Sequence, residues 1–478
     1  MPQTRRRLVL SALVLGITAT GCAGRRPVVV VPVPPPTADL AAAITHGCYR
    51  CLEGAFDLAQ TRGARQQAFE AATLLALRSK ELGLPHDAWL TRARELAAPD
   101  GSSAVALAIA DAIPIDPLRD REASLAVAER MRARASLPEW RKGLQEPAGS
   151  DAFRAYLDVS LVCSFQGAPD RDAILAAGSW PPVPLLQYRV GVCASTQRGH
   201  VTTLQAGDPS YVDADYALGR YALEDSLNPD QDEALRRLQS AAAAFPASPA
   251  IATTLGQLHR SREEWAQALA AYDAALAVSP RHADASIGRV ISLSNLGRRD
   301  EAIDTATRVI EAGQWFLGEA HYWRAWNHLQ SGQLALARSD ADRTRTLMVN
   351  AAVFVLSGLI DWRLRRVDTA EQEFERALAM DFGQCEAAQY LGTVRADRAR
   401  LPEAIAAFVQ ARQCYDLSLT LRREALAKTL AGPATGTTRE RATERQERAI
   451  KDVEGRRQDV MQALQTLERA TGTKPSEP

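Results

Sequence analysis

The side chains with the most reactive chemistry lie in the stretch HGCYRCLEG, where His46, Cys48 and Cys51 are close together. A C-x-x-C spacing with a histidine nearby is used by thiol redox sites and by metal sites. The setting favours neither, because a thioredoxin-type motif requires a βαβ unit and this stretch has a helical pattern. Haem attachment requires histidine directly after the second cysteine, where Leu52 stands, and structural zinc requires four ligands. We therefore expect a structural disulfide with no metal or cofactor, and keep a C-x-x-C thiol oxidoreductase as an alternative.

A further cysteine, Cys22, follows an apolar stretch at the start of the chain. Arg5 to Arg7 precede thirteen uncharged residues, Leu8 to Thr20, and small side chains end the stretch. This order is typical of an export signal. Thirteen helical residues reach only about 20 Å, short of the roughly 30 Å hydrocarbon core of a bilayer. We expect residues 1–21 to be a signal peptide and not a membrane span.

The four residues that end in Cys22, Ala-Thr-Gly-Cys, resemble the lipobox of bacterial lipoproteins. The resemblance implies cleavage before Cys22 and acylation of its sulfur and new amino terminus, and several acyl chains hold a protein firmly on a membrane. Ordinary secretion remains an alternative, because Ala19 stands where leucine is usual. A plain basic start is preferred over a twin-arginine signal. Ala23 is not the aspartate that retains enteric lipoproteins at the inner membrane, so we expect the outer membrane, facing the periplasm.

The residues after Cys22 predict a spacer. Arg25 to Thr37 read RRPVVVVPVPPPT, and prolines fix φ and remove backbone donors, which favours polyproline II. At about 3.1 Å per residue this segment spans roughly 40 Å. Residues 22–37 are therefore expected to hold the folded part away from the lipid.

The charge balance bears on possible partners. Loss of the leader removes three of the 57 basic residues and leaves 54 against 57 acidic ones. Nucleic-acid binding requires a clustered basic excess, so we expect no nucleic-acid partner. Only 6% of residues are aromatic, and the alternating β-branched runs of strands are missing. The composition predicts an almost wholly helical protein.

Beyond Cys22 the chain has an even number of cysteines, six, which in an exported protein indicates disulfides. Six thiols can pair in many ways. Proximity in the sequence favours three local pairs, which are Cys48–Cys51, Cys163–Cys193 and Cys385–Cys414.

Alanines recur at a nearly constant interval through the second half of the chain, with steps of 34, 34, 35, 33 and 34 residues. These are Ala234, Ala268, Ala302, Ala337, Ala370 and Ala404. Apolar or small residues follow at +4 and +7, which places all three positions on one stripe of a helix. Self-similarity at this period is typical of helical repeats.

The pattern resembles that of tetratricopeptide repeats, which runs W-x2-L-G-x2-Y, A-x3-F-x2-A and then P. Residues 249–282 fit best, with Leu255-Gly256, Ala268, Tyr272 and Pro280 in place, although the tryptophan is missing throughout. The resemblance covers 212–416 and implies an all-α, right-handed α-solenoid, because each hairpin has an apolar face that only its neighbours can bury.

In this family a concave groove lined by the first helices holds a protein segment, at the second, fifth, ninth, twelfth and thirteenth positions. The resemblance implies that Tyr322 and Trp326 in one unit, and Leu359, Trp362 and Arg363 in the next, face this groove. Such residue types dominate binding energy at interfaces. The alternative, that the aromatic rings pack between repeats, is about as strong for Trp326 and Trp362 and stronger for Trp323.

The flanks of the array are also predicted to be helical. In 38–211 we expect degenerate helical repeats that extend the solenoid, with segments near 39–60, 64–83, 85–97 and 117–135. In 417–478 we expect the last helix to continue to Leu430, followed by a charged capping helix. Val453, Val460 and Leu467 form a thin apolar seam on it. A cap over the last repeat is preferred over a coiled-coil partner site.

The sequence contains no Walker loop, HExxH or Gly-x-Ser-x-Gly motif, so we expect no enzyme. The preferred hypothesis is a lipid-anchored scaffold that binds a protein segment of the cell envelope in its groove. Its layout resembles that of lipoproteins that assist outer-membrane or pilus secretin assembly. A glycan-binding lipoprotein of the SusD-like kind is the alternative, disfavoured because those proteins carry large insertions between repeats.

Overall fold

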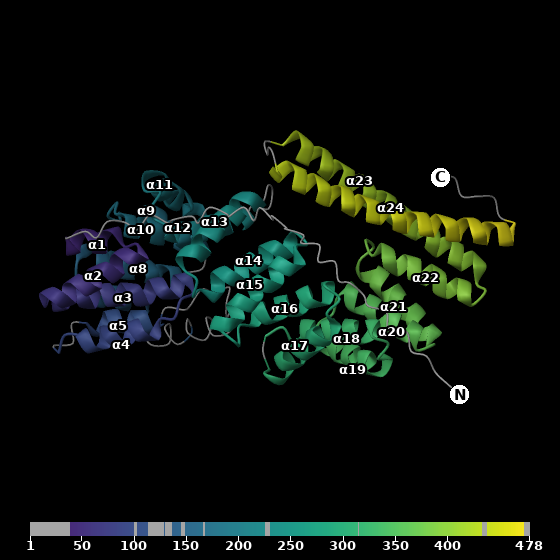
Figure 1. Cartoon of the computed structure of the whole chain (residues 1–478), viewed down its shortest axis with the longest axis horizontal. Coiled ribbons are helices and arrows are strands. Elements are labelled where there is room, and N and C mark those ends of the chain that lie inside the picture. Colours follow the sequence, from purple (N-terminus) through teal and green to yellow (C-terminus); the bar gives the residue numbers. More distant parts are fainter. Residues whose placement is uncertain are drawn as a thin grey trace, which may run out of the picture.

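The structure is a computed structural model of the chain, and the described parts consist of helices and their connections (Figure 1). It describes residues 39–99, 103–112, 129, 136–144, 149–165, 168–224, 230–313, 315–432 and 437–472. The predicted signal peptide, Cys22 and the proline-rich spacer lie outside these ranges, as does nearly all of the segment at 117–135. In the described ranges no helix is both long and apolar enough to span a membrane. The fold is an all-α solenoid.

The N-terminal part is built around one enclosed helix, α3. Its helices are α1 (Leu40–His46), α2 (Tyr49–Arg62), α3 (Arg65–Leu82), α4 (Asp87–Leu96), α5 (Ala104–Ala112), α7 (Leu137–Gly143), α8 (Asp151–Phe165), α9 (Ala168–Ala177), α10 (Pro184–Cys193), η1 (Ser195–Gln197) and α11 (Gly199–Gly207). Nearly all of α3 is buried, even Arg78 and Lys80, because α2, α4 and α5 pack around it. The segments predicted at 64–83 and 85–97 correspond to α3 and α4.

The segment near 39–60, predicted to be helical, consists of two helices, α1 and α2. The chain breaks at Gly47, which has φ +68°, and a Cβ there would lie only 2.4 Å from Leu185 Cδ1 on α10. Only glycine fits both the left-handed backbone and the close approach. The break places Cys48 at the N-cap of α2, so the C-x-x-C motif begins a helix instead of lying within one.

The second half is a row of hairpins, six in the described residues between Asp213 and Ala431. They are α12 (Asp213–Glu224) with α13 (Gln231–Ala244), α14 (Pro249–Ser261) with α15 (Trp265–Val278), α16 (Ala283–Asn295) with α17 (Arg299–Glu311), α18 (Leu317–Gln330) with α19 (Leu334–Leu347), α20 (Ala351–Arg363) with α21 (Val367–Met380), and α22 (Cys385–Asp397) with α23 (Leu401–Ala431). Each hairpin packs on the next, and in Figure 1 they run in order from α12, beside the N-terminal helices on the left, to α22 on the right.

The periodic alanines explain how closely the helices approach. All six are 0% exposed, and the residues at +4 and +7 are buried as well. Gly256 and Gly288 lie against the Tyr272 ring, where a Cβ would come within 2.6 Å and 2.2 Å of ring atoms. Gly358 and Gly392 lie in the same way against Phe374 and Phe408. Small residues on first helices therefore make room for large rings on second helices.

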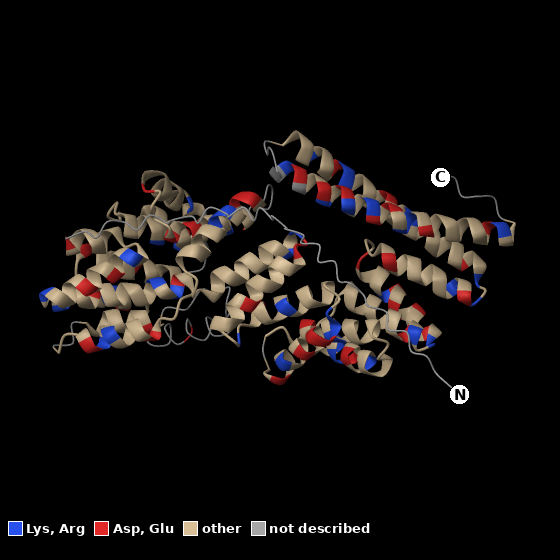
Figure 2. Ribbon diagram, viewed as in Figure 1, with Lys and Arg blue, Asp and Glu red and all other residues tan. Residues whose placement is uncertain are grey.

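The C-terminal part is a long hairpin of α23 and α24 (Thr437–Thr471). The predicted seam of Val453, Val460 and Leu467 packs against Tyr415 and Leu419 of α23. Charged residues of both signs line the rest of α24 (Figure 2). The seam is thus covered within the chain, as the cap interpretation expected.

The six cysteines form the three predicted local pairs. Cys163–Cys193 joins the ends of α8 and α10 across the irregular SWPPVP stretch. Cys385–Cys414 joins the first turn of α22 to α23, and so links the two helices of one hairpin. Cross-links of this kind restrict the unfolded chain and so stabilise the fold.

Candidate functional site

The first helices of the repeats form one continuous inner layer. Successive first helices α12, α14, α16, α18, α20 and α22 contact one another, in addition to their own hairpin partners. In a curved stack the more closely spaced helices line the concave side. The predicted groove residues all lie on this layer.

Tyr322 and Trp326 lie on α18, one turn apart, and both are half-buried. They pack with Leu359 of α20 against a small core that includes Leu356 and Ile360. Burial raises the pKa of the Tyr322 hydroxyl above its ordinary value. Trp323 packs on the core between α16 and α17, and its ring meets the Tyr322 ring edge to face with centroids 5.6 Å apart. One side of each groove ring is therefore fixed by packing while the residue remains partly exposed.

Trp362 extends this surface along α20 to α22. Its indole N–H donates to Asp397 Oδ2 at 3.3 Å, and its ring lies 6.3 Å from that of Tyr390. Arg363 next to it is exposed, and its charge opposes the burial that raises the pKa of Tyr390. Tyr390 stands one place away from the family's groove positions, so it was not among the residues predicted from the sequence. We name Tyr322, Trp326, Leu359, Trp362 and Tyr390 the aromatic face.

A small pocket with both polar and apolar lining lies on the same layer at the other end of the array. It is a pocket of about 130 Å³ between α12, α14 and α16. Its lining includes Arg220, Glu224, Thr253, Gln257, His282 and Asp284. The Thr253 hydroxyl is buried there without a hydrogen-bond partner in the structure. The inner layer thus has this pocket at one end in addition to the aromatic face.

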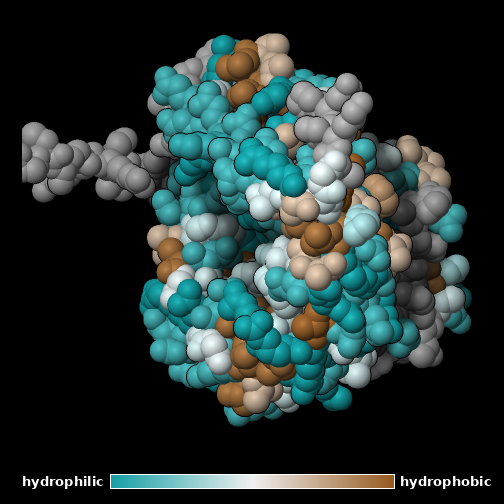
Figure 3. Space-filling model, turned by 90° about the vertical axis from the view of Figure 1, so that its right-hand side faces the viewer, coloured by the Kyte–Doolittle hydropathy of each residue, from teal (hydrophilic) through white to brown (hydrophobic). Residues whose placement is uncertain are grey.

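Apolar side chains are also exposed outside the inner layer. Phe382, Leu417 and Leu421 near the C-terminal hairpin are 73%, 62% and 56% exposed. In the view onto this end of the molecule, hydrophobic residues form separate patches among hydrophilic ones (Figure 3). Scattered exposure of this kind is ordinary on a protein surface.

The repeat unit decides the type of array. Hairpins recur about every 34 residues, with a buried alanine in each second helix and glycines against aromatic rings in several first helices. The array is a tetratricopeptide-repeat solenoid. Its most complete unit is 249–282. In the third unit Arg289-Val290 stands where Leu-Gly is expected, and Gly288 lies against the Tyr272 ring of the preceding hairpin.

Similar solved structures are also repeat proteins. YrrB, described as a tetratricopeptide protein with an unusual peptide-binding site, is 21% identical; the match covers 37% of this chain and 91% of YrrB, with a TM-score of 0.31. PilW, described as a widely conserved type IV pilus biogenesis factor, is 21% identical over 44% of this chain and 94% of its own, with a TM-score of 0.36. A tetratricopeptide repeat protein from Parabacteroides merdae is 16% identical over 57% and 98%, with a TM-score of 0.34. No family model matches the sequence, and neither does any curated protein.

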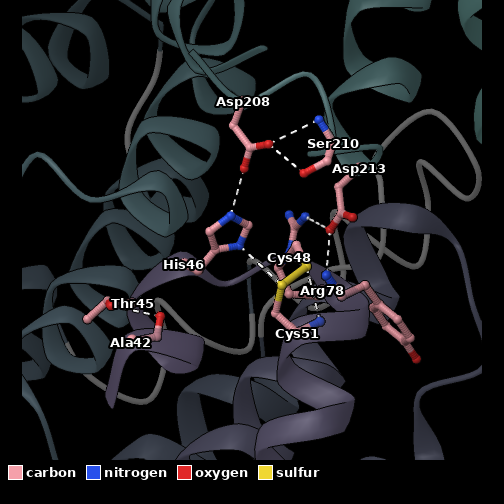
Figure 4. The surroundings of a disulfide bond; sticks show 10 residues. Ala42, Thr45, His46, Cys48, Cys51, Arg78, Asp208, Ser210 and Asp213 are labelled. Atoms are coloured by element: carbon pink, nitrogen blue, oxygen red, sulfur yellow. Dashed lines mark hydrogen bonds and ion pairs between the residues drawn. A yellow bond between two sulfur atoms is a disulfide. The ribbon is translucent and has the colours of Figure 1, made fainter. Parts of the chain in front are cut away.

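The second candidate site is the Cys48–Cys51 disulfide at the start of α2 (Figure 4). His46 lies between it and Asp208, with Nδ1 3.2 Å from Cys51 Sγ and Nε2 2.7 Å from Asp208 Oδ2. Asp208 precedes α12 and is 162 residues from His46, so no local pattern in the sequence could reveal this contact.

A buried ion pair fixes the start of α2 beside this disulfide. The backbone N–H of Tyr49, in the first turn, donates to Asp213 Oδ2 at 2.9 Å. The same carboxylate accepts from Arg78 of α3, which is fully buried. The Arg78 guanidinium also lies 3.7 Å above the Tyr188 ring. These contacts hold α2, α3 and α12 together under the disulfide.

His46, Cys48 and Cys51 have their ligand-type atoms within 4.8 Å of one another. Both sulfurs are bonded to each other in the structure, so neither is a thiolate ligand in this state. A structural zinc site would also need a fourth ligand. The arrangement suits thiol–disulfide chemistry better than metal binding.

Proposed function

We propose that the protein is a lipid-anchored scaffold on the outer membrane, facing the periplasm, that binds a segment of a cell-envelope protein on the inner layer of its repeats. The observation that carries the binding proposal is the aromatic face, whose rings stay half-exposed on neighbouring first helices. Packing from behind holds these rings in one orientation, which lowers the entropy lost on binding. Arg363 adds a positive charge at the edge for an acidic or carbonyl-rich segment.

The anchor is supported by the sequence of residues 1–37, which resembles a lipoprotein signal, its acylated cysteine and a spacer. The two parts of the proposal are independent. A scaffold on a spacer of roughly 40 Å could reach partners beyond the lipid headgroups.

To test the binding proposal, Trp326 and Trp362 are replaced by alanine together, and partners from cell envelopes are captured by crosslinking. Central aromatic residues at interfaces contribute about 2 kcal/mol or more each, so we expect capture of the principal partner to fall by more than about tenfold. The matched control is Trp315→Ala, because Trp315 is 52% exposed in the turn before α18 and outside the aromatic face.

The double alanine variant could also lose packing, so a second variant separates binding from folding. Arg363→Glu changes an exposed charge and leaves the core intact. We expect its circular dichroism and melting temperature to match the wild type while capture falls. Equal capture by wild type, Arg363→Glu and the double variant would refute the proposal, and capture of a glycan by the same face would favour the SusD-like alternative.

The anchor is tested by Cys22→Ser. Because acyl chains need the sulfur and the new amino terminus of this residue, we expect the variant in the soluble periplasmic fraction. Membrane retention equal to the wild type would contradict lipid anchoring without affecting the binding proposal.

A further inference from the structure

The contacts of Cys51 resemble those of an activated thiol. Asp208 is fixed by the backbone N–H of Ser210 at 3.0 Å and by its hydroxyl. Burial opposes ionisation of Asp208, but the hydrogen bonds from Ser210 and His46 outweigh it and lower the pKa of this carboxyl. An anionic Asp208 requires a proton on His46 Nε2, 2.7 Å away. The other nitrogen, Nδ1, then faces Cys51 Sγ and is placed to take the proton of a thiol.

The contacts of Cys48 suit a sulfur that leaves as an anion. Cys48 is the N-cap of α2, and its Sγ accepts the backbone N–H of Cys51 at 3.0 Å. The positive end of a helix dipole stabilises a thiolate at this position. A thiolate that is stabilised in this way is a good leaving group in disulfide exchange.

Exposure distinguishes the two sulfurs. Cys48 is only 3% exposed, whereas Cys51 is half-buried and the side chains of His46 and Asp208 are 27% and 28% exposed. An external thiolate therefore reaches Cys51 first. Figure 4 shows His46 and Asp208 on the side of the disulfide that faces Cys51.

The other two disulfides close much longer loops of the chain. They join residues 30 and 29 apart, whereas Cys48–Cys51 joins residues 3 apart and restricts the unfolded chain least. The start of α2 is already held by Asp213. The fold therefore needs this bridge less than the others.

We propose that Cys48–Cys51 is an exchange-active disulfide that accepts electrons from external dithiols, with Cys51 as the attacked sulfur and, in the reduced form, His46 as the base that takes the proton of the Cys51 thiol. This activity goes beyond the scaffold function and does not depend on it. The motif alone had favoured a purely structural bridge, and the Asp208–His46–Cys51 contacts are what change that interpretation.

The exchange balances as two steps. A thiolate of the dithiol attacks Cys51 Sγ, a mixed disulfide forms, the Cys48–Cys51 bond breaks, and Cys48 leaves as the thiolate at the helix start. The second thiolate of the dithiol then attacks its own sulfur in the mixed disulfide, and Cys51 leaves. Two electrons pass to the protein, the dithiol becomes a disulfide, and its two protons end on Cys48 and on Cys51 or His46.

Two single variants of the full chain, each in a Cys22→Ser background, test the assignment. Cys48→Ser and Cys51→Ser remove the same bridge, but the first leaves the accessible thiol and the second leaves the buried one. With oxidised glutathione, we expect the Cys48→Ser protein to form the mixed disulfide about tenfold faster or more, as measured by intact mass. Equal rates would overturn the roles given to the two sulfurs.

Two further measurements test the role of His46 as a base and the ease with which the Cys48–Cys51 bridge is reduced. His46→Gln, added to Cys48→Ser, should slow the reaction at neutral pH and bring its rate–pH profile to that of a free thiol. With dithiothreitol, the wild-type Cys48–Cys51 bridge should be reduced before Cys163–Cys193, as followed by alkylation and peptide mass. A profile unchanged by His46→Gln, or reduction of the two bridges together, would refute the proposal and leave the scaffold function untouched.

Discussion

Lys80, in the N-terminal part, is a charged residue whose burial could not be predicted from the sequence. Lys80 of α3 is 4% exposed, and its ammonium donates to the carbonyl oxygens of Ala110 and Asp111 at 2.6 Å and 3.2 Å. These are among the last carbonyls of α5, which lack partners within that helix. Burial lowers the pKa of Lys80 to about 8, although Asp111 and Asp87 oppose the shift.

This gives a prediction for the pH dependence of stability. Between about pH 8 and the unfolded pKa near 10.4, the unfolded chain binds a proton at Lys80 that the folded protein lacks, so stability rises with pH. Compared with Lys80→Met, which has no such group, the wild type should gain about 1 to 2 kcal/mol between pH 7.5 and 9.5. Urea unfolding of both proteins at the two pH values measures the difference. Parallel changes in the two proteins would show that Lys80 is not desolvated in the fold.

What the sequence could predict at this scale depended on distance along the chain. The cysteine pairs are local and followed from proximity. The contact between His46 and Asp208 joins residues 162 apart and could not be predicted, because nothing in either segment indicates the other.

Removing Cys385–Cys414 by serine substitution should lower the free energy of unfolding by about 3 to 4 kcal/mol, and removing Cys48–Cys51 by only about 2, since the chain-entropy cost grows with loop length.

At the scale of the helices, the turns inside the five hairpins from α14 to α23 each have a left-handed residue at the same place. Glu263, Gly297, Gly332, Arg365 and Ala399 have φ between +56° and +73° and follow the repeat period. Glycine occupies only two of these places. The other side chains are strained, since a left-handed conformation costs a non-glycine residue about 1 to 2 kcal/mol.

We therefore expect Ala399→Gly to stabilise the protein by about 0.5 to 1 kcal/mol, because relief of strain exceeds the extra freedom of glycine in the unfolded chain. Gly297→Ala should destabilise it by about 1 kcal/mol for the same reason. Ala270→Gly, on the exposed side of α15, is the control and should destabilise by about 1 kcal/mol. In a protein of this length melting curves would show shifts of about 0.5 to 1 °C, and a lower melting temperature for Ala399→Gly would contradict the strain.

The repeat period of about 34 residues could be recognised in the sequence because the same small residues face the same neighbours in each hairpin, as the buried alanines show. The break between α1 and α2 at Gly47 could not be predicted in this way. It depends on Leu185 of α10, which lies far away in the sequence. The predicted groove residues lie on the first helices α18 and α20, whereas Tyr390 of α22 was not predicted because it stands one place away from the family's groove positions.

At the scale of the whole molecule, the C-terminal hairpin links the two ends of the array. In a repeat solenoid, each repeat normally contacts only the adjacent repeats. Here Arg445 near the start of α24 donates to Gln231 Oε1 of α13 at 2.9 Å, across 214 residues. Burial lowers the pKa of Arg445, and so does the positive charge of Arg262 in the turn between α14 and α15. In Figure 1 the hairpin runs along the array from α22 back to α13.

This contact predicts that the first and last repeats are coupled through α24. Removal of residues 437–478 uncovers Tyr415 and Leu419, so α23 should lose protection in amide hydrogen exchange and the protein should self-associate. Protection should also fall at α13, which no neighbour-only array would show. Arg445→Ala is the matched variant, because it breaks the distant contact and leaves the seam on α23 intact. It should loosen α13 while protection at α23 stays at the wild-type level. If α13 exchanges at the wild-type rate in both variants, the hairpin caps the last repeat and does not couple the ends.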